Sequence, residues 1–217
     1  MNKKAIIFDL DGIIVDTAKY HYLAWKNLAN ELGFEFTENQ NEQLKGVSRV
    51  RSLEILLEIG NIELSEDKKQ TLLTEKNKEY LEYVNKMTSD EILPGIGKLL
   101  NYLEGNNIKF ALGSASKNAT LILKKVGLLD KFTAIVDGNN VSKAKPDPEV
   151  FINAAEKLDR EYSNCIVIED ALAGVQAANN AGMTSVGIGD KNILNEANYN
   201  LESTYELTIH FIKKLIA

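Results

Sequence analysis

The sequence lacks the features of a secreted, membrane-bound or nucleic-acid-binding protein. Its one cysteine, Cys165, excludes a disulfide within the chain and lies in an apolar run, which predicts a small buried side chain. Its 25 lysines and arginines are outnumbered by 31 acids and form no block, so we expect no nucleic-acid partner. The apolar run that follows Lys4 is too short for a signal-peptide core or a membrane span. A cytoplasmic protein with no membrane partner, acting as a monomer, is therefore expected.

Nucleotide-binding loops and internal repeats are also missing. The glycine pairs at 95–97 and 187–189 lack the third glycine of a dinucleotide fingerprint, and there is no Walker-type loop. What remains is a chain of 217 residues, 44% hydrophobic, which is enough for one sizeable domain or a core with a small accessory domain.

Short apolar runs alternate with helical patterns in most of the chain. The expected strands lie at 5–8, 108–112, 133–136, 165–168 and 184–188, and the expected helices between them lie at 95–105, 116–127, 148–158 and 171–182. This alternation is typical of right-handed βαβ crossovers. It predicts an α/β protein with a Rossmann-like parallel sheet.

The segment from about residue 17 to residue 88 has helical periodicity throughout and no convincing strand. An all-helical stretch of this size between the first strand and the rest of an α/β unit is expected to form a separate cap. We therefore predict a catalytic core of residues 1–15 and 91–217 and an inserted helical cap domain of residues 16–90. A cap on two short tethers can close over a site by hinge motion.

Two aspartates stand at the end of the first apolar run. Side chains alternate along a strand, so Asp9 and Asp11 can point the same way, while Gly12 releases the chain into a loop. Two converging carboxylates repel one another unless a cation or a shared proton compensates. The pair indicates a metal site, an acid/base pair or both, and the alternative is a plain strand-to-turn junction with solvated acids.

Further polar residues follow the later strands, where ligands bind to open parallel sheets. Ser114 to Asn118 offers hydroxyls, a cation and a helix start that suit a phosphate, or a simple helix cap. Lys145 precedes a proline and is either a counter-charge for carboxylates or a solvated loop lysine. Glu169 and Asp170 supply hard oxygen ligands suited to Mg²⁺, or they merely complement a helix dipole. The coincidence at four strand ends favours the functional interpretation.

These residues, taken in order, resemble the haloacid dehalogenase superfamily of phosphotransferases with a helical cap. Asp9-Leu10-Asp11-Gly12 is similar to the first motif of that superfamily, Ser114 to the second, Lys145 to the third and Glu169-Asp170 to the fourth. The resemblance extends over essentially the whole chain.

The cap segments resemble those of the sugar-phosphate mutases in this superfamily. The segments concerned are Asp16-Thr17-Ala18 through His21 to Trp25, and Lys45 to Arg49 with Ser52 and Leu53. Val15 departs from the threonine often found in mutases and is more typical of phosphatases. The resemblance implies a phosphoprotein isomerase that interconverts β-D-glucose 1-phosphate and glucose 6-phosphate through an aspartyl phosphate and β-glucose 1,6-bisphosphate.

The resemblance also implies roles for particular residues. The implied catalytic residues are Asp9 (nucleophile), Asp11 (general acid and base), Thr17, His21, Ser114 and Lys145. The implied substrate-binding residues are Lys45, Gly46, Val47, Ser48, Arg49, Ser52, Ala115, Ser116, Lys117 and Asn118. The implied cofactor is Mg²⁺, held at Asp9, Asp11, Glu169 and Asp170. The implied ligands are a phosphorylated hexose and its bisphosphate intermediate.

Two other functions remain open from the sequence. The first is a sugar-phosphate phosphatase with the same core chemistry, in which water attacks the aspartyl phosphate. The second is a non-enzymatic signalling module with a phosphorylatable aspartate, against which the inserted cap and the loop at 45–49 count.

Overall fold

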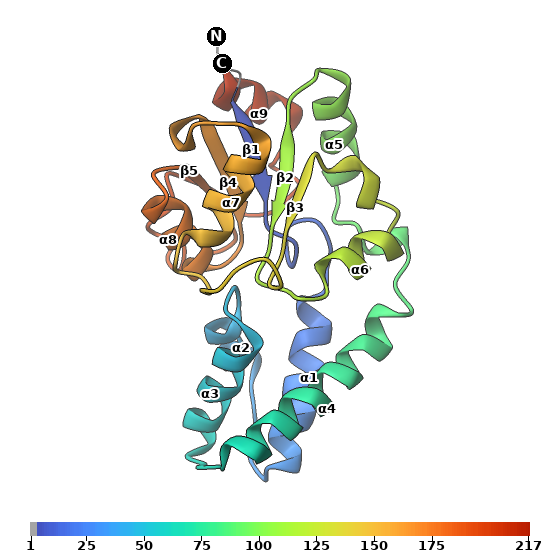
Figure 1. Cartoon of the computed structure of the whole chain (residues 1–217), viewed down its shortest axis with the longest axis vertical. Coiled ribbons are helices and arrows are strands. Elements are labelled where there is room, and N and C mark those ends of the chain that lie inside the picture. Colours follow the sequence, from blue (N-terminus) through green and yellow to red (C-terminus); the bar gives the residue numbers. More distant parts are fainter. Residues whose placement is uncertain (1–3) are drawn as a thin grey trace.

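The core of the molecule is a six-stranded, all-parallel sheet with the strand order β3-β2-β1-β4-β5-β6 (Figure 1). The structure is a computed structural model that describes residues 4–217. The strands are β1 (Ala5–Phe8), β2 (Phe110–Gly113), β3 (Ala134–Val136), β4 (Cys165–Glu169), β5 (Thr184–Ile188) and β6 (Tyr199–Leu201). The α/β fold and the five expected strands are confirmed. The sixth strand, β6, was not expected because it is short and largely exposed at the sheet edge.

Helices cover both faces of this sheet. Ile6 and Phe8 of β1 pack on one face with α5, α6 and α9, whereas Ala5 and Ile7 pack on the other with α7 and α8. A central parallel strand therefore reads as a continuous apolar run, which is the pattern from which it was predicted. The core helices are α5 (Ile96–Gly105), α6 (Ala119–Lys125), α7 (Glu149–Leu158), α8 (Leu172–Asn180) and α9 (Ile209–Ile216). The sequence interpretation did not include α9, which begins after an N-cap at Thr208.

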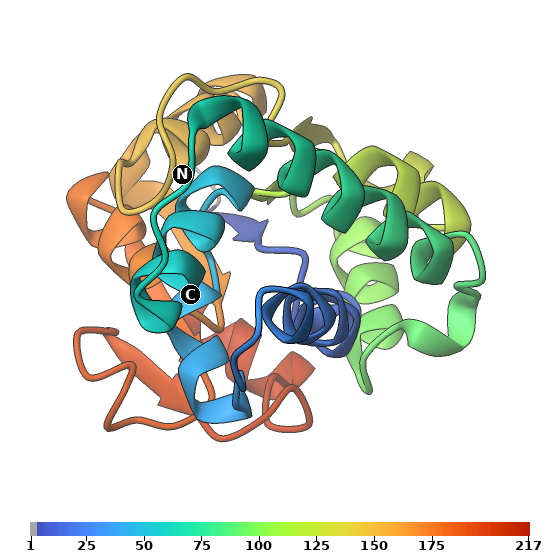
Figure 2. The ribbon, with the colours of Figure 1, turned by 90° about the horizontal axis from the view of Figure 1, so that it is seen from below.

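The segment between β1 and α5 is helical, as predicted, and has a hydrophobic cluster of its own around Trp25, Leu53 and Leu72. Its helices are α1 (Ala18–Glu31), α2 (Glu38–Asn41), α3 (Arg49–Gly60) and α4 (Glu66–Val84). They lie together below the carboxyl edge of the sheet, and Figure 2 shows α1 nearly end-on with α4 running across the same end. In residues 4–217, no helix is long and apolar enough to span a membrane.

Both tethers of this cap meet at one place. Val15 forms bridges to Asp11 on one side and to Ile92 on the other. The Asp16 N–H donates to the Glu91 carbonyl at 3.1 Å, and the Leu93 N–H donates to the Ile14 carbonyl at 3.0 Å. The chain therefore enters and leaves the cap side by side. Domain limits at 15/16 and 90/91 stay a prediction, and residues 1–3 of the predicted core lie outside the described residues.

Candidate active site

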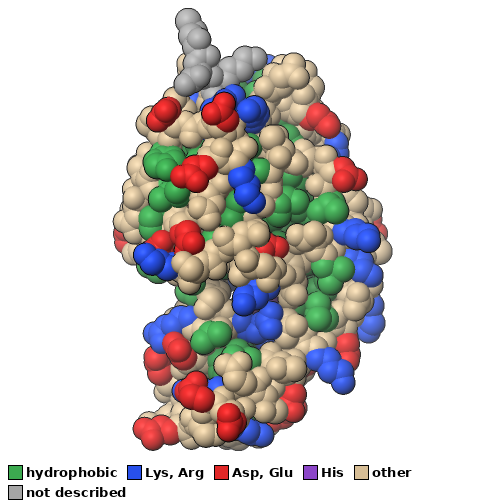
Figure 3. Space-filling view, in the orientation of Figure 1, with side chains coloured by type: hydrophobic (Ala, Val, Ile, Leu, Met, Phe, Trp, Pro, Cys, Tyr) green, Lys and Arg blue, Asp and Glu red, His purple; other side chains and the backbone are tan. Residues whose placement is uncertain are grey.

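A cavity of about 560 Å³ lies between the carboxyl edge of the sheet and the cap. Its lining combines core residues that follow β1, β2, β3 and β4 with residues of α1, α3 and the loop before α3. Lys and Arg side chains are visible at the narrowing between the two parts (Figure 3). Of the predicted site residues, the lining contains Asp9, Asp11, His21, Lys45, Gly46, Val47, Ser48, Arg49, Ser52, Ser114, Ala115, Ser116, Lys117, Asn118, Lys145 and Asp170.

Lys145 connects the first, second and fourth strands. Its ammonium group donates to Asp9 Oδ1 at 2.5 Å, to Glu169 Oε1 at 2.7 Å and to the Gly113 carbonyl at 3.2 Å. Burial acts to lower the Lys145 pKa, but Asp9 and then Glu169 outweigh it, so the pKa is raised. The lysine is only 3% exposed and remains charged beside the carboxylate expected to carry the phosphoryl group.

Asp9 and Asp11 are brought together as expected, but they differ in environment. Asp9 Oδ2 accepts the Asp11 backbone N–H at 3.0 Å, and Asp11 Oδ1 accepts the hydroxyl of Thr17 at the start of α1. Burial first, and the Asp9 charge second, raise the pKa of Asp11 to about 7. The Thr17 hydroxyl, which is fully buried, orients one oxygen of Asp11 and leaves the other for a ligand.

Glu169 and Asp170 have separate surroundings. Glu169 is not among the residues that line the cavity; its Oε1 accepts from Lys145 and its Oε2 accepts the Ala171 N–H at 2.7 Å. Asp170 lines the cavity, and a Cβ on Gly12 would lie 2.2 Å from its Oδ2. Burial, then Glu169, then Asp9 raise the Asp170 pKa well above its usual value. A cation beside Asp170 would relieve this repulsion.

These surroundings change the predicted metal set. In residues 4–217, no group of three or more His, Cys, Asp or Glu side chains is arranged to hold a metal ion. Mg²⁺ needs less, since it retains several waters and is commonly bound by one or two carboxylates plus substrate phosphate. The carboxylates of Asp9 and Asp170 with the carbonyl of Asp11 fit such a site. Glu169 does not fit as a direct ligand, because it is fully buried and is not among the residues that line the cavity.

The loop after β2 is more compact than expected. Helix α6 begins at Ala119 rather than at 116, because hydroxyls take the preceding amides: Ser114 Oγ accepts the Ser116 N–H at 3.1 Å, and Ser116 Oγ accepts the Asn118 N–H at 3.2 Å. Within 114–118, the N–H groups of Ser116 and Asn118 are therefore engaged by side chains, and the N–H of Ser114 is engaged by the Val136 carbonyl. The side-chain amide of Asn118 donates from Nδ2 to Oδ1 of Asn77 on α4 at 3.1 Å, and this hydrogen bond links the core to the cap.

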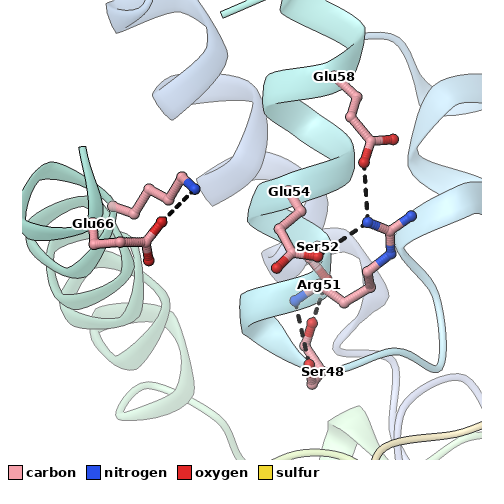
Figure 4. Close-up of polar contacts among 7 residues, drawn as sticks. Ser48, Arg51, Ser52, Glu54, Glu58 and Glu66 are labelled. Carbon is pink, nitrogen blue, oxygen red and sulfur yellow. Dashed lines mark hydrogen bonds and ion pairs between the residues drawn. The ribbon is translucent and has the colours of Figure 1, made fainter. Parts of the chain in front are cut away.

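The cap contributes the loop before α3 and the first turn of that helix. Ser48 caps α3 by accepting the Arg51 N–H at 3.3 Å, and Ser52 donates to the Ser48 carbonyl at 3.2 Å (Figure 4). Arg51 turns away toward Glu54 and Glu58, whereas Arg49 lines the cavity, where burial lowers its pKa. Of these two arginines, Arg49 is thus the one that lines the cavity, and its role in binding the substrate stays a prediction.

Gly46 lies where the cap loop approaches the core. Its φ is +71°, and a Cβ there would lie 2.6 Å from the Cβ of Ala171, at the start of α8. A side chain at this position would prevent the present approach of the cap. The cap loop and the start of α8 are therefore close together at Gly46.

His21 belongs to a buried group that the sequence interpretation only partly found. Its Nδ1 lies 2.9 Å from the Lys76 ammonium, and its ring stacks on Tyr80 with centroids 4.1 Å apart. Burial, then Lys76, then Arg49 lower the His21 pKa well below its usual value, so the ring is neutral and Nδ1 accepts. Lys76, 3% exposed, was missed, although a lysine on the apolar stripe of α4 with Leu73 and Tyr80 was a visible signal.

Comparison with known proteins agrees with this geometry. The family model described as haloacid dehalogenase-like hydrolase matches residues 6–188. The chain therefore belongs to the haloacid dehalogenase-like hydrolase family.

Relatives within the family include both mutases and phosphatases. The chain is 44% identical to a β-phosphoglucomutase of Bacillus subtilis over 96% of this chain and 93% of the relative. It superposes on the crystal structure of a β-phosphoglucomutase from Clostridium difficile with a TM-score of 0.92 and 45% identity, covering 98% and 96% of the two chains. It is 30% identical to a phosphorylated carbohydrates phosphatase of Thermotoga maritima, over 92% and 91% of the chains.

Proposed function

We propose that this protein is a β-phosphoglucomutase, an isomerase that interconverts β-D-glucose 1-phosphate and glucose 6-phosphate. The reaction passes through an aspartyl phosphate on Asp9 and through β-glucose 1,6-bisphosphate. The similarity over nearly the whole chain to two β-phosphoglucomutases supports this function. The chain is proposed to act as a cytoplasmic monomer, since one chain supplies both walls of the cavity.

The observation that carries the proposal is the distribution of cations around one cavity. Lys145 stands beside Asp9, while Lys45 and Arg49 from the cap and Lys117 from the core loop line the same cavity. A bisphosphate needs two anion-binding regions, and guanidinium and ammonium groups are the usual partners of phosphate. Release of a single phosphate requires only the region at Asp9. The second set of cations is what a mutase needs.

Phosphoryl transfer then follows from the placement of the two aspartates. An Asp9 oxygen forms the new bond to phosphorus while the bond from phosphorus to the sugar oxygen breaks, and Asp11 gives its proton to that leaving oxygen. In the other half-reaction, a sugar hydroxyl oxygen forms a bond to phosphorus while the bond from phosphorus to the Asp9 oxygen breaks and the Asp9 carboxylate is restored, and Asp11 accepts the proton of that hydroxyl. Lys145 and Ser114 hold the transferring group and stabilise its charge.

Mg²⁺ is the proposed cofactor, held by Asp9, Asp170 and the Asp11 carbonyl. Bound there, it neutralises phosphate charge as the anionic nucleophile approaches. Glu169 has another role in this scheme, because it holds Lys145 in place through Oε1 while the Ala171 amide fixes Oε2. A Cβ on Gly174 would lie 1.8 Å from Glu169 Oε1, so this carboxylate packs directly on the start of α8.

A cap that closes over the cavity protects the phosphoenzyme from water. Thr17 at the start of α1 bonds to Asp11, so the position of the cap and the orientation of the general acid are linked. Val15, whose identity is more typical of phosphatases, is fully buried in the core cluster, and the cavity lining does not include it. Its departure from threonine therefore concerns packing at the tether.

The decisive experiment uses β-glucose 1-phosphate with Mg²⁺ and catalytic bisphosphate. We expect glucose 6-phosphate as the product, with little free phosphate, and the α anomer serves as the control. Asp9→Asn should abolish phosphoenzyme formation, whereas Asp11→Asn should retain metal binding and lose transfer to and from the sugar. Free phosphate as the main product would instead establish the sugar-phosphate phosphatase that the similarity to the Thermotoga maritima protein keeps as the second candidate.

A further inference from the structure

The loop between β3 and α7 forms part of the cavity wall and carries the lysine that contacts the proposed nucleophile. Residues 137–148 form no helix or strand, and five consecutive residues, Val141 to Lys145, line the cavity. The N–H groups of such a segment are satisfied by side chains or by water rather than by a helix or a sheet. The place of the Lys145 ammonium beside Asp9 therefore depends on what holds this loop.

Glu149, the first residue of α7, accepts hydrogen bonds from the beginning of this cavity-lining stretch. The Ser142 N–H donates to both carboxylate oxygens at 3.0 Å, and Oε2 also accepts the Ser142 hydroxyl at 2.9 Å and the Lys143 N–H at 2.7 Å. The Ser142 N–H first and the Lys143 N–H second lower the Glu149 pKa, so the carboxylate is ionised at neutral pH. Hydrogen bonds to a charged acceptor are stronger than those between neutral groups. One carboxylate thus fixes two successive residues of the segment that ends at Lys145.

The first turn of α7 also contacts the other end of the same stretch. Phe151, two residues after Glu149, is fully buried, and its ring centroid lies 4.8 Å from the Lys145 ammonium. A Cβ on Gly113 would lie 2.8 Å from the Phe151 ring, so this ring packs directly on the end of β2. The start of α7, fixed by the core, therefore supports both the beginning of the stretch and the lysine at its end.

Glu149 does not itself reach the reacting groups. It is partly exposed and is not among the residues that line the cavity, whereas its neighbour Val150 is. An acid in the first turn of a helix also complements the helix dipole. That effect needs no donor from a loop, whereas three donors of the loop converge on this carboxylate.

We propose that Glu149 is a positioning residue that holds Ser142 and Lys143 against α7 and so sets the backbone from which Lys145 reaches Asp9. This role deepens the proposed function and rests on the part given there to Lys145 in phosphoryl transfer. Lys145 stabilises charge that develops on the transferring group, so a small displacement of its backbone lowers the rate of transfer. Binding of the sugar by the cap should change little.

The test compares Glu149→Gln with Glu156→Gln. Glu156 is an exposed residue of the same helix whose carboxylate accepts the Tyr162 hydroxyl at 3.2 Å, so it controls for loss of a hydrogen-bonded charge on α7. Glu149→Gln keeps one acceptor oxygen but places an amide NH₂ against the loop donors. We expect it to lower kcat about tenfold, the effect of losing one hydrogen bond to a charged group, with KM within about twofold of wild type. Glu156→Gln should change neither.

Two further measurements separate positioning from a merely structural role. Hydrogen exchange of the Ser142 and Lys143 amides should accelerate in Glu149→Gln, while the free energy of unfolding in urea stays close to that of wild type. Glu149→Asp, which keeps the charge, should recover most of the lost kcat. An unchanged kcat in Glu149→Gln would overturn the inference, as would an equal loss in Glu149→Asp or a loss that disappears when kcat is expressed per folded molecule.

Failure of the proposed function would look different. Product identity in the wild-type protein decides between mutase and phosphatase. If the wild type releases phosphate, the same kcat comparison is made on phosphate release, where Lys145 and Asp9 still serve the transfer step. The role of Glu149 is then tested independently of which acceptor takes the phosphoryl group.

Discussion

Replacing Gly46 by alanine should prevent full closure of the cap. The new Cβ would lie 2.6 Å from the Cβ of Ala171, whereas carbon atoms in contact are normally about 3.5–4.0 Å apart. The cap loop must therefore retreat by about 1 Å, and a displacement of this size at a catalytic constellation can cost about 10²-fold in rate. We expect Gly46→Ala to lower kcat/KM for β-glucose 1-phosphate by about that factor.

Gly33 provides the matched control. It also lies in the cap, has a φ of +90°, and a Cβ there would meet nothing within 4 Å. Both alanine variants carry the cost of a left-handed residue, roughly 1–2 kcal/mol, which urea unfolding measures. Only Gly46→Ala should lose activity, and its fraction of turnovers ending in free phosphate should rise. A kcat/KM for Gly46→Ala equal to that of Gly33→Ala would refute the reasoning.

Three further predictions concern the charged groups of the site. Lys145→Met leaves Asp9 and Glu169 buried without their cation. This variant should lower the free energy of unfolding in urea by about 3–5 kcal/mol and abolish turnover. Lys143→Met, in the same loop, removes only the ion pair with Asp147 and should do neither. Burial, then Arg49, lower the Lys76 pKa from 10.5 to about 7, so between these values the unfolded chain binds the extra proton and stability rises with pH. The stability of Lys76→Met relative to wild type should therefore fall by roughly 2 kcal/mol between pH 7 and pH 9, whereas Lys78→Met, at an exposed position of α4, should show no such change. Asp170→Asn should raise the Mg²⁺ concentration for half-maximal activity at least about tenfold, while Glu169→Gln should lower kcat without that shift; the reverse result would exchange their assigned roles.

The parts of the fold that the sequence predicted are those with both faces buried or with strong helical periodicity. The run Ala5–Phe8 is buried throughout, so its apolar character is continuous and a parallel strand follows. Strand β6 carries no such signal, because Tyr199 and Asn200 are exposed and hydrogen bonds to β5 define it. The predicted start of α6 at residue 116 was wrong, because the hydroxyls of Ser114 and Ser116 accept the backbone N–H groups of Ser116 and Asn118.

The site shows a similar division. Asp9, Asp11 and Asp170 directly follow strand ends, where the sheet topology favours a common site. Lys145 lies further along the loop after β3, and only the family resemblance implied its inward position. The sequence carried no comparable signal for side-chain contacts between helices that are far apart along the chain. Lys76 reaches His21 across 55 residues of chain. The hydrogen bonds that Lys145 and the Ala171 N–H donate to the Glu169 carboxylate also depend on backbone geometry, which the motif Glu-Asp does not reveal.

The double bridge at Val15 has a consequence for how this protein can change. Because Asp16 and Glu91 are hydrogen-bonded neighbours, one contiguous insert carries α1 to α4, and its two ends lie within the span of a two-residue hairpin turn. We expect that an insert joined in this way can be exchanged as a unit without breaking the parallel sheet. Exchange brings a new sugar-facing wall with its cations, while Asp9, Lys145 and Asp170 stay where they are. The insert therefore supplies the part of the cavity wall that Lys45 and Arg49 line, while Lys117 of the core lines the same cavity and Thr17 of the insert bonds to Asp11.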